Sequence, residues 1–130
     1  MFHYTVETEK TVDEAVRAVE EACAKRKFGV LWQLDIPTKL LEKGIRFDQS
    51  YRVLEVYNPD IAKKVLTRNQ QAGHFLPCKI VVYTDGDTGK TQIGLSRPTA
   101  LFALTEDEHL LSIAKEVESA LIRALDEAKA

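Results

Sequence analysis

The chain has 130 residues, 45% of them hydrophobic and 29% charged, which is the balance of a globular domain rather than of a disordered or membrane-embedded segment. Residues 1–130 are enough to bury one core, so we expect a single domain. A net charge of −2 supplies no general attraction to nucleic acid or to an anionic lipid surface, and we expect neither as a partner.

The N-terminal stretch "MFHYTVETEK" carries acidic residues early and contains no apolar run, so we expect no secretory leader. No segment approaches the about 18 apolar residues of a membrane span. The chain has two cysteines, Cys23 and Cys78. A chain with a full-sized core and no leader keeps such cysteines as thiols in a reducing compartment, and we therefore predict a cytoplasmic protein.

The first third of the chain alternates between strand and helix signals. Residues 2–8 alternate apolar and polar side chains, which predicts a strand. "TVDE" at 11–14 has the pattern of a capping box, and the apolar positions after it recur at helical spacing as far as Cys23. Cys23 is therefore predicted to lie on the packed side of a first helix. Alternating apolar residues over 30–36 predict the second strand.

Short motifs divide the middle of the chain. "PTKLLEKG" at 37–44 predicts a short helical turn, because proline favours a helix start and glycine a helix end. "SYRVLEVY" at 50–57 is rich in strand formers and predicts the third strand. Asn58 followed by Pro59 is a helix start, and we expect the apolar stripe of this second helix to include Leu66.

The last part of the chain contains a hairpin and a long helix. "CKIVVYT" at 78–84 and "KTQIGLS" at 90–96 predict two strands joined by the turn "DGDTG". "TEDE" at 105–108 predicts a second capping box, which opens the final helix. The resulting order is β-α-β-β-α-β-β-α, with strands partly in adjacent pairs. This order predicts an α+β fold, in which helices cover one face of an antiparallel or mixed sheet.

The segment "GDTGKT" at 86–91 ends like a phosphate-binding loop. That loop needs a glycine five positions before Gly89, where this chain has Thr84, and it needs a helix after it. Here the segment joins two predicted strands. We therefore assign it to a hairpin turn, in which aspartate and glycine serve the backbone.

The stretch "GHFLPCKIVVY" at 73–83 holds the strongest chemical candidates, His74 and Cys78. A neighbouring imidazole can lower the pKa of a thiol and so make it a nucleophile or a metal ligand. Strand alternation, however, gives Cys78 the same face as Ile80 and Val82, and a free cysteine packs well as a small apolar residue. A buried structural thiol is the favoured interpretation, and a functional thiol stays open as the alternative.

The run "RVLEVYNPDIAKKVL" together with "GHFLPCKIVVYTDGDTGKTQIGL" resembles the small prokaryotic family known as domain of unknown function 302, and the likeness extends over essentially the whole chain. The resemblance implies a compact α+β domain with a curved, mainly antiparallel sheet and helices packed on it, similar to one half of a TATA-binding-protein-like fold. It also implies pairing into dimers, and it brings no biochemical activity. The family motif matches Asn58, Pro59, Leu76, Pro77 and Cys78.

Many members of that family carry a cysteine directly before the Asn-Pro pair, where this chain has Tyr57. This departure argues against a metal or redox site built from two cysteines. Tyr57 is more simply a strand residue that packs on the sheet.

The preferred functional hypothesis is a homodimeric module that binds a small molecule or a partner without catalysis. It is preferred because no nucleophile and no acid–base pair emerge from the sequence. The candidate ligand-binding residues are Tyr57, Asn58, His74 and Cys78. No cofactor is assigned.

Two further hypotheses compete with it. One is a thiol-centred metal or redox site in which Cys78 is the ligand or nucleophile and His74 its partner. The other is an enzyme that uses strand carboxylates such as Glu55 or Asp35. We rank the enzyme last, because an acid on the solvent face of an antiparallel strand needs no special role.

Overall fold

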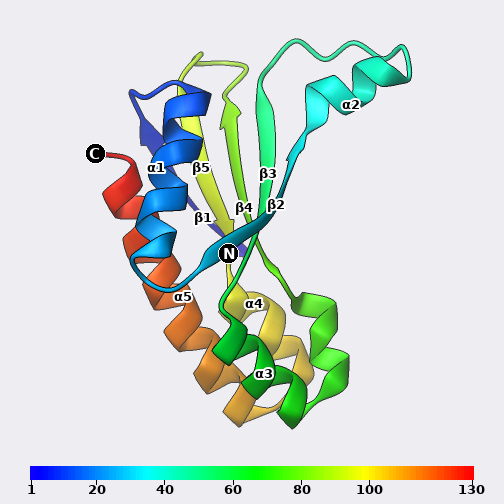
Figure 1. Ribbon diagram of the computed structural model, residues 1–130, viewed down its shortest axis with the longest axis vertical. Helices are drawn as coiled ribbons and strands as arrows, with labels where there is room; N and C mark the ends of the chain where they lie inside the picture. The colour runs from blue at the N-terminus through cyan, green and yellow to red at the C-terminus, as the bar shows by residue number, and fades with distance from the viewer.

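The computed structural model describes residues 1–130 and has the predicted α+β architecture. The chain forms five strands, five α-helices and two short 3-10 helices, and Figure 1 shows how the labelled strands and α-helices are arranged. In order they are β1 (His3–Thr8), α1 (Val12–Ala24), β2 (Gly29–Asp35), α2 (Ile36–Glu42), β3 (Tyr51–Tyr57), α3 (Pro59–Arg68), η1 (Gln70–Phe75), β4 (Cys78–Thr84), β5 (Thr91–Ser96), α4 (Pro98–Phe102), η2 (Ala103–Thr105) and α5 (Glu108–Ala128). None of the helices has the length and apolar character needed to cross a bilayer.

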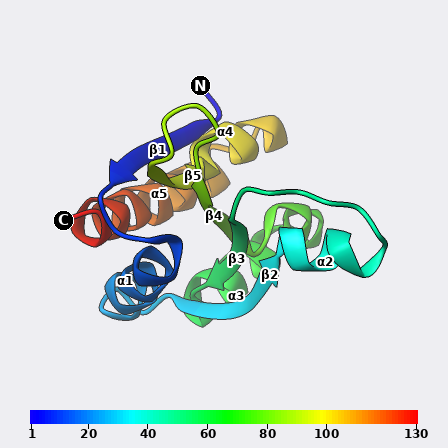
Figure 2. The same cartoon turned by 90° about the horizontal axis from the view of Figure 1, so that it is seen from above.

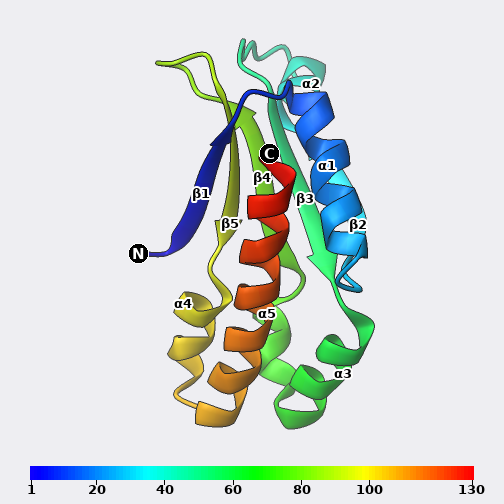
Figure 3. The same ribbon diagram turned by 90° about the vertical axis from the view of Figure 1, so that its left-hand side faces the viewer.

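The five strands form one open sheet in the order β1-β5-β4-β3-β2, and every neighbouring pair is antiparallel. The two edges are therefore β1 and β2. Helices α1 and α5 lie side by side against one face of this sheet, as Figures 1 and 3 show from two directions. The prediction of an antiparallel sheet with helices on one face is thus confirmed.

The core lies between the sheet and these two helices. Alternate residues of the central strands point into it, and Leu54, Ile80 and Val82 are fully buried. Cys23 of α1 is also fully buried, as predicted from helical spacing. The predicted capping box at the start of α1 is confirmed, because the Thr11 hydroxyl accepts from the amide of Glu14 and the Glu14 carboxylate accepts from the amide of Thr11.

The elements α3, η1, α4 and η2 gather beyond one end of the sheet, at the bottom of Figure 1. The Asn58 side chain caps α3 by accepting from the amides of Asp60 and Ile61, as the Asn-Pro motif predicted. The rings of Phe75 and Phe102 pack there with their centroids 5.5 Å apart. This cluster extends the core past the strand ends.

Two local expectations are wrong. The final helix begins at Glu108 with Asp107 as its N-cap, because Glu106 adopts a left-handed conformation (φ 55°) that separates Thr105 from the helix. Leu66 is 41% exposed rather than buried, since α3 lies at the rim of the molecule and only one of its sides is covered.

A buried carboxylate joins α5 to the segment that follows β5. Glu118 of α5 accepts from Arg97 Nε and Nη2, both at 3.2 Å, and from the amide and hydroxyl of Thr99 at 3.0 and 2.7 Å. Burial by itself would raise the pKa of Glu118, but the hydrogen bonds from Thr99 and Arg97 outweigh it and hold the pKa below its usual value of 4.5. The carboxylate is therefore charged and fully bonded in the folded chain.

We expect Glu118→Gln to be less stable than the wild type by about 1.5–3 kcal/mol at neutral pH, because bonds to a charged group are lost. The folded chain binds the Glu118 proton more weakly than the unfolded chain does. The stabilisation by Glu118 is therefore present above pH 4.5 and is lost as the pH falls further. Urea unfolding at a series of pH values should show the wild type and the variant converging in acid; an equal difference at every pH would contradict this account.

Burial also predicts which leucines support the fold. Leu121 of α5 is fully buried, whereas Leu104 of η2 is 72% exposed. Leu121→Ala should lower the free energy of unfolding by about 2–5 kcal/mol because it leaves a cavity. Leu104→Ala, the matched control, should change it by less than about 0.5 kcal/mol. Urea denaturation followed by circular dichroism measures both.

Candidate functional site

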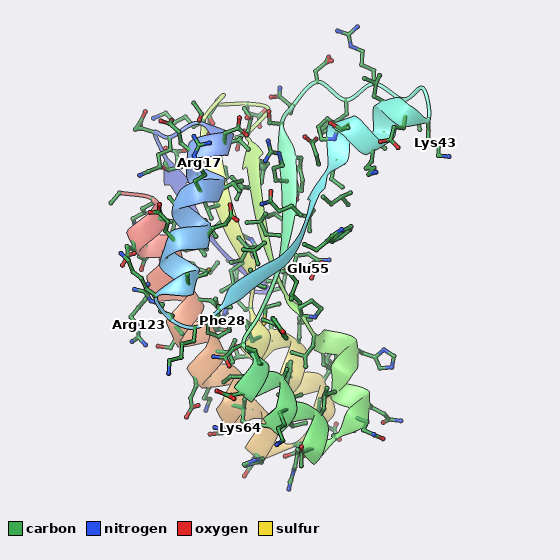
Figure 4. All side chains as sticks on the ribbon, viewed as in Figure 1. Arg17, Phe28, Lys43, Glu55, Lys64 and Arg123 are labelled. Carbon is green, nitrogen blue, oxygen red and sulfur yellow. The ribbon has the colours of Figure 1, made fainter.

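The sheet face opposite α1 and α5 carries no helix across it. Figure 2 looks along the strands, so that the sheet is seen end-on with α1 and α5 on one side of it. Residues paired in register share a face, and the central pairs here are Tyr51 with Tyr83, Val53 with Val81 and Glu55 with Lys79. Glu55, which is labelled in Figure 4, lies near the end of β3. We call this surface the open face.

The open face is hollowed over β1, β5, β4 and the start of β3. The hollow has a volume of about 510 Å³. Gly94 forms part of its lining, and a Cβ atom there would lie 3.1 Å from Thr5 Oγ1 and 3.2 Å from Val81 Cγ2. The hollow is lined by Phe2, His3, Thr5, Tyr51, Lys79, Val81, Tyr83, Gly94, Leu95 and Ser96. Because Gly94 has no side chain, the surface stays hollow at this point of β5, where a larger residue would press against Thr5 and Val81.

Aromatic rings form part of the apolar surface of the hollow. The rings of Tyr51 and Tyr83 are stacked, with centroids 5.1 Å apart and planes inclined by 16°. Phe2 packs edge-on to His3 with the ring centroids 4.8 Å apart, yet Phe2 is 73% exposed. Burial, and then the neighbouring Tyr83, raise the pKa of Tyr51. Tyr51 therefore keeps its hydroxyl proton at neutral pH and can donate a hydrogen bond.

One ion pair lies beside the aromatic rings. Lys79 Nζ is 3.3 Å from Glu55 Oε1, and the Glu55 side chain is 15% exposed whereas that of Lys79 is 52% exposed. Glu55 is thus covered by its neighbours, while the ammonium of Lys79 reaches solvent at the hollow. The hollow accordingly combines flat apolar surfaces with one accessible positive charge.

The carboxylates considered for catalysis have structural partners. Glu55 pairs with Lys79, and Asp35 caps α2 by accepting from the amide of Thr38 at 3.2 Å. Asp35 also lies 3.5 Å from Arg52 Nε. Neither carboxylate is placed against a second acid as an acid–base pair would require.

The ligand residues expected from the sequence lie elsewhere, and the structure brings only three of them together. Tyr57, Asn58 and Cys78 line a narrow crevice between the strand ends and α3. Its volume of about 20 Å³ is close to that of one water-sized probe, and its lining is mainly apolar. The oxygen of the Asn58 side chain is already engaged in capping α3. His74 lies exposed on η1 and does not line the crevice.

The environment of Cys78 is that of a packed thiol. Burial, and then the charge of Glu55, raise the pKa of Cys78 to about 11. Burial likewise raises the pKa of Cys23 to about 11. A reactive cysteine needs a lowered pKa, so the two thiols look alike and neither is activated. No three His, Cys, Asp or Glu side chains anywhere in the chain are grouped as a metal ion would require.

Reactive residue types alone do not predict the hollow, because its lining contains neither a cysteine nor a catalytic motif. A signal for it was present: every second residue of 51–55 and of 79–83 combines aromatic, aliphatic and charged side chains, although these positions belong to the solvent side of their strands. A glycine inside a strand, such as Gly94, is a second signal of close approach.

Comparisons with known proteins were made on the whole chain. The family model described as "Domain of unknown function DUF302" matches residues 4–128. A solved structure described as the crystal structure of an uncharacterized conserved protein DUF302 from Bacillus stearothermophilus is 42% identical, with a TM-score of 0.94 over 98% of each chain. A comparison with curated proteins finds no match.

The environments of the thiols predict their reactivity. At neutral pH we expect both Cys23 and Cys78 to react slowly with Ellman's reagent, because their pKa values of about 11 leave almost no thiolate. Cys78→Ser should remove one of the two slow thiols without changing the rate of the other. A fast Cys78 beside a slow Cys23 would contradict this expectation and restore the thiol-centred hypothesis.

Proposed function

The chain belongs to the DUF302 family, a family of domains of unknown function, and on its structure we propose that it is a homodimeric binding module without catalytic activity. The observation that carries this proposal is the open face with its hollow of about 510 Å³. Volumes of about 300–1,000 Å³ are usual for small-molecule sites. We further propose a cytoplasmic location, which the two free thiols support.

The exposure of large apolar side chains supports a binding role for this face. Phe2 is 73% and Trp32 54% exposed, and in register Trp32 lies next to Glu55 of the open face. An antiparallel sheet commonly has one face in water, but that face then carries mainly polar side chains. Phe2 directly precedes the edge strand β1 and Trp32 lies on the edge strand β2, so large apolar side chains are exposed at both edges of the sheet, as is typical of interaction surfaces.

The chemistry of the hollow favours one class of ligand. Stacked tyrosine rings and Val81 offer flat apolar contact, and the Lys79 ammonium offers one charge-assisted bond. A flat, largely apolar molecule with an anionic group fits both features. The crevice beside Cys78 gives a weaker basis for ligand binding, because about 20 Å³ leaves no room for such a molecule unless α3 moves.

The absence of a catalytic arrangement among these residues supports binding rather than turnover. The open face holds two carboxylates in register: Glu55 is paired with Lys79, and Glu7 lies 3.6 Å from Lys90 Nζ and accepts from the side chain of Gln92 at 3.1 Å. Tyr51, whose pKa is raised by burial, is a protonated donor at neutral pH rather than a base. Nothing in the hollow pairs a nucleophile with a base.

Anilinonaphthalene sulfonate, which is flat, apolar and anionic, is a direct probe of the hollow. We expect saturable binding to the native protein, with Tyr83→Ala weakening the affinity about two- to tenfold through the lost ring contact. Leu66→Ala, which removes an exposed leucine of α3 outside the open face, is the matched control and should leave the affinity unchanged. Fluorescence titration measures all three proteins. Equal affinities would place the dye elsewhere and contradict the proposed ligand site.

Sedimentation velocity tests the homodimer. The wild type should sediment with twice the subunit mass of 14.7 kDa. Val81→Glu places a charge on the open face and should shift the protein toward the monomer, whereas Leu66→Glu should not. A wild type that stays monomeric at all accessible concentrations would contradict the proposed homodimer. The proposed ligand site would then still be tested by the dye titration.

A further inference from the structure

A projecting segment accompanies the open face. Residues 36–50, which we call the arm, consist of α2 and the chain that leads to β3. Figures 1 and 2 show the arm extending from the β2–β3 end of the sheet, away from α1 and α5. In Figure 4, Lys43 marks its outer end. Helix α2 has no buried residue at all.

The arm presents apolar side chains to water. Leu41 is 67%, Ile45 54% and Phe47 46% exposed. Three large apolar residues exposed on one segment are unfavourable in an isolated subunit, because each leaves much of its area in water. No other part of this chain covers them.

The arm is nevertheless ordered by its own bonds. The amides of Lys43 and Ile45 both donate to the carbonyl of Leu40 at 3.0 Å, and Gly44 makes the turn with a φ of 75°. At the other end the Asp35 side chain caps α2. The apolar side chains are thus held outward by a formed turn, which lowers the entropy cost of docking them.

The exposed area of the whole chain is larger than its mass requires. The chain exposes 7828 Å². The scaling for compact monomers gives about 6,900 Å² for a protein of 14.7 kDa, so the excess is about 900 Å². A stable interface of standard size buries about 800 Å² from each partner. The excess therefore matches what one side of a dimer interface covers.

We propose that a second copy of the chain covers the open face and that the arm of each copy closes the hollow of the other. This inference rests on the proposed homodimer and specifies how it is built. One chain supplies both surfaces, an uncovered sheet face and an arm with apolar side chains, and Figures 1 and 2 show both on the side away from α1 and α5. Two copies that face each other about a two-fold axis bury both surfaces reciprocally, as an isologous interface requires.

In this arrangement both subunits of the dimer form the ligand site. The hollow is open to solvent in one subunit, and side chains from the arm of the second subunit form its missing wall. Ligand affinity and dimer affinity are then coupled, because a ligand held by both subunits binds the monomer less well. The dye site and the dimer should accordingly be lost together when the arm is altered.

Charged arm variants test this inference. Leu41→Glu combined with Phe47→Glu should weaken dimerisation about tenfold or more, because both anchors would carry a charge into the interface. Leu104→Glu is the matched control, since Leu104 is 72% exposed on η2 and lies outside both surfaces. Circular dichroism should show all three proteins folded, and sedimentation measures the dimer. An unchanged dimer in the arm variant overturns the role of the arm and leaves the homodimer intact.

Photo-cross-linking locates the docking site directly. Phe47 is replaced by p-benzoylphenylalanine, and this protein is mixed with isotopically heavy wild-type chains so that links between subunits are recognised by mass. We expect links from position 47 to heavy peptides that contain 51–55, 79–83 or 92–96. Links to the partner's arm or to its helices α1 and α5 overturn the inference while leaving a homodimer. A monomeric wild type overturns both the inference and the dimer on which it rests.

Discussion

The one-sided burial of the antiparallel sheet is the constraint on which the rest of the structure depends. Helices α1 and α5 pack on one face, where Leu54, Ile80 and Val82 are fully buried. The period of two along each strand then sends the intervening residues to the other face. Because no helix returns across that face, its aromatic and aliphatic side chains meet solvent or a partner.

The chemistry of the candidate residues follows from the face on which each one lies. Cys78 lies on the helix side of β4, where burial raises the pKa of its thiol and makes it part of the packing. Lys79, its neighbour in the chain, lies on the open side and keeps an accessible charge. Cys78 and Lys79 are adjacent in the strand but point to opposite faces, so the first is part of the packing and the second is available to a ligand.

Much of the fold followed from local patterns. The Thr11 capping box, the Asn58 cap and the hairpin around Asp85 each depend on bonds between residues close in the chain, and each was predicted correctly. The predicted start of the final helix was wrong, because two nearby residues can both act as the N-cap. Thr105 and Asp107 are both good caps, and the left-handed conformation of Glu106 decided between them.

The sequence by itself determined the class of fold, the placement of Cys23 and Cys78 in the packing, and the membership of a family, since periodicity and short motifs encode all three. Only the tertiary structure decided which residues from distant parts of the chain are in contact. It joined Arg97 and Thr99 to Glu118, stacked Tyr51 on Tyr83, and left the arm without a partner in its own subunit. These contacts join residues that are distant in the chain. The distances between them are set by strand order and helix packing, so the spacing of residues in the sequence does not predict them.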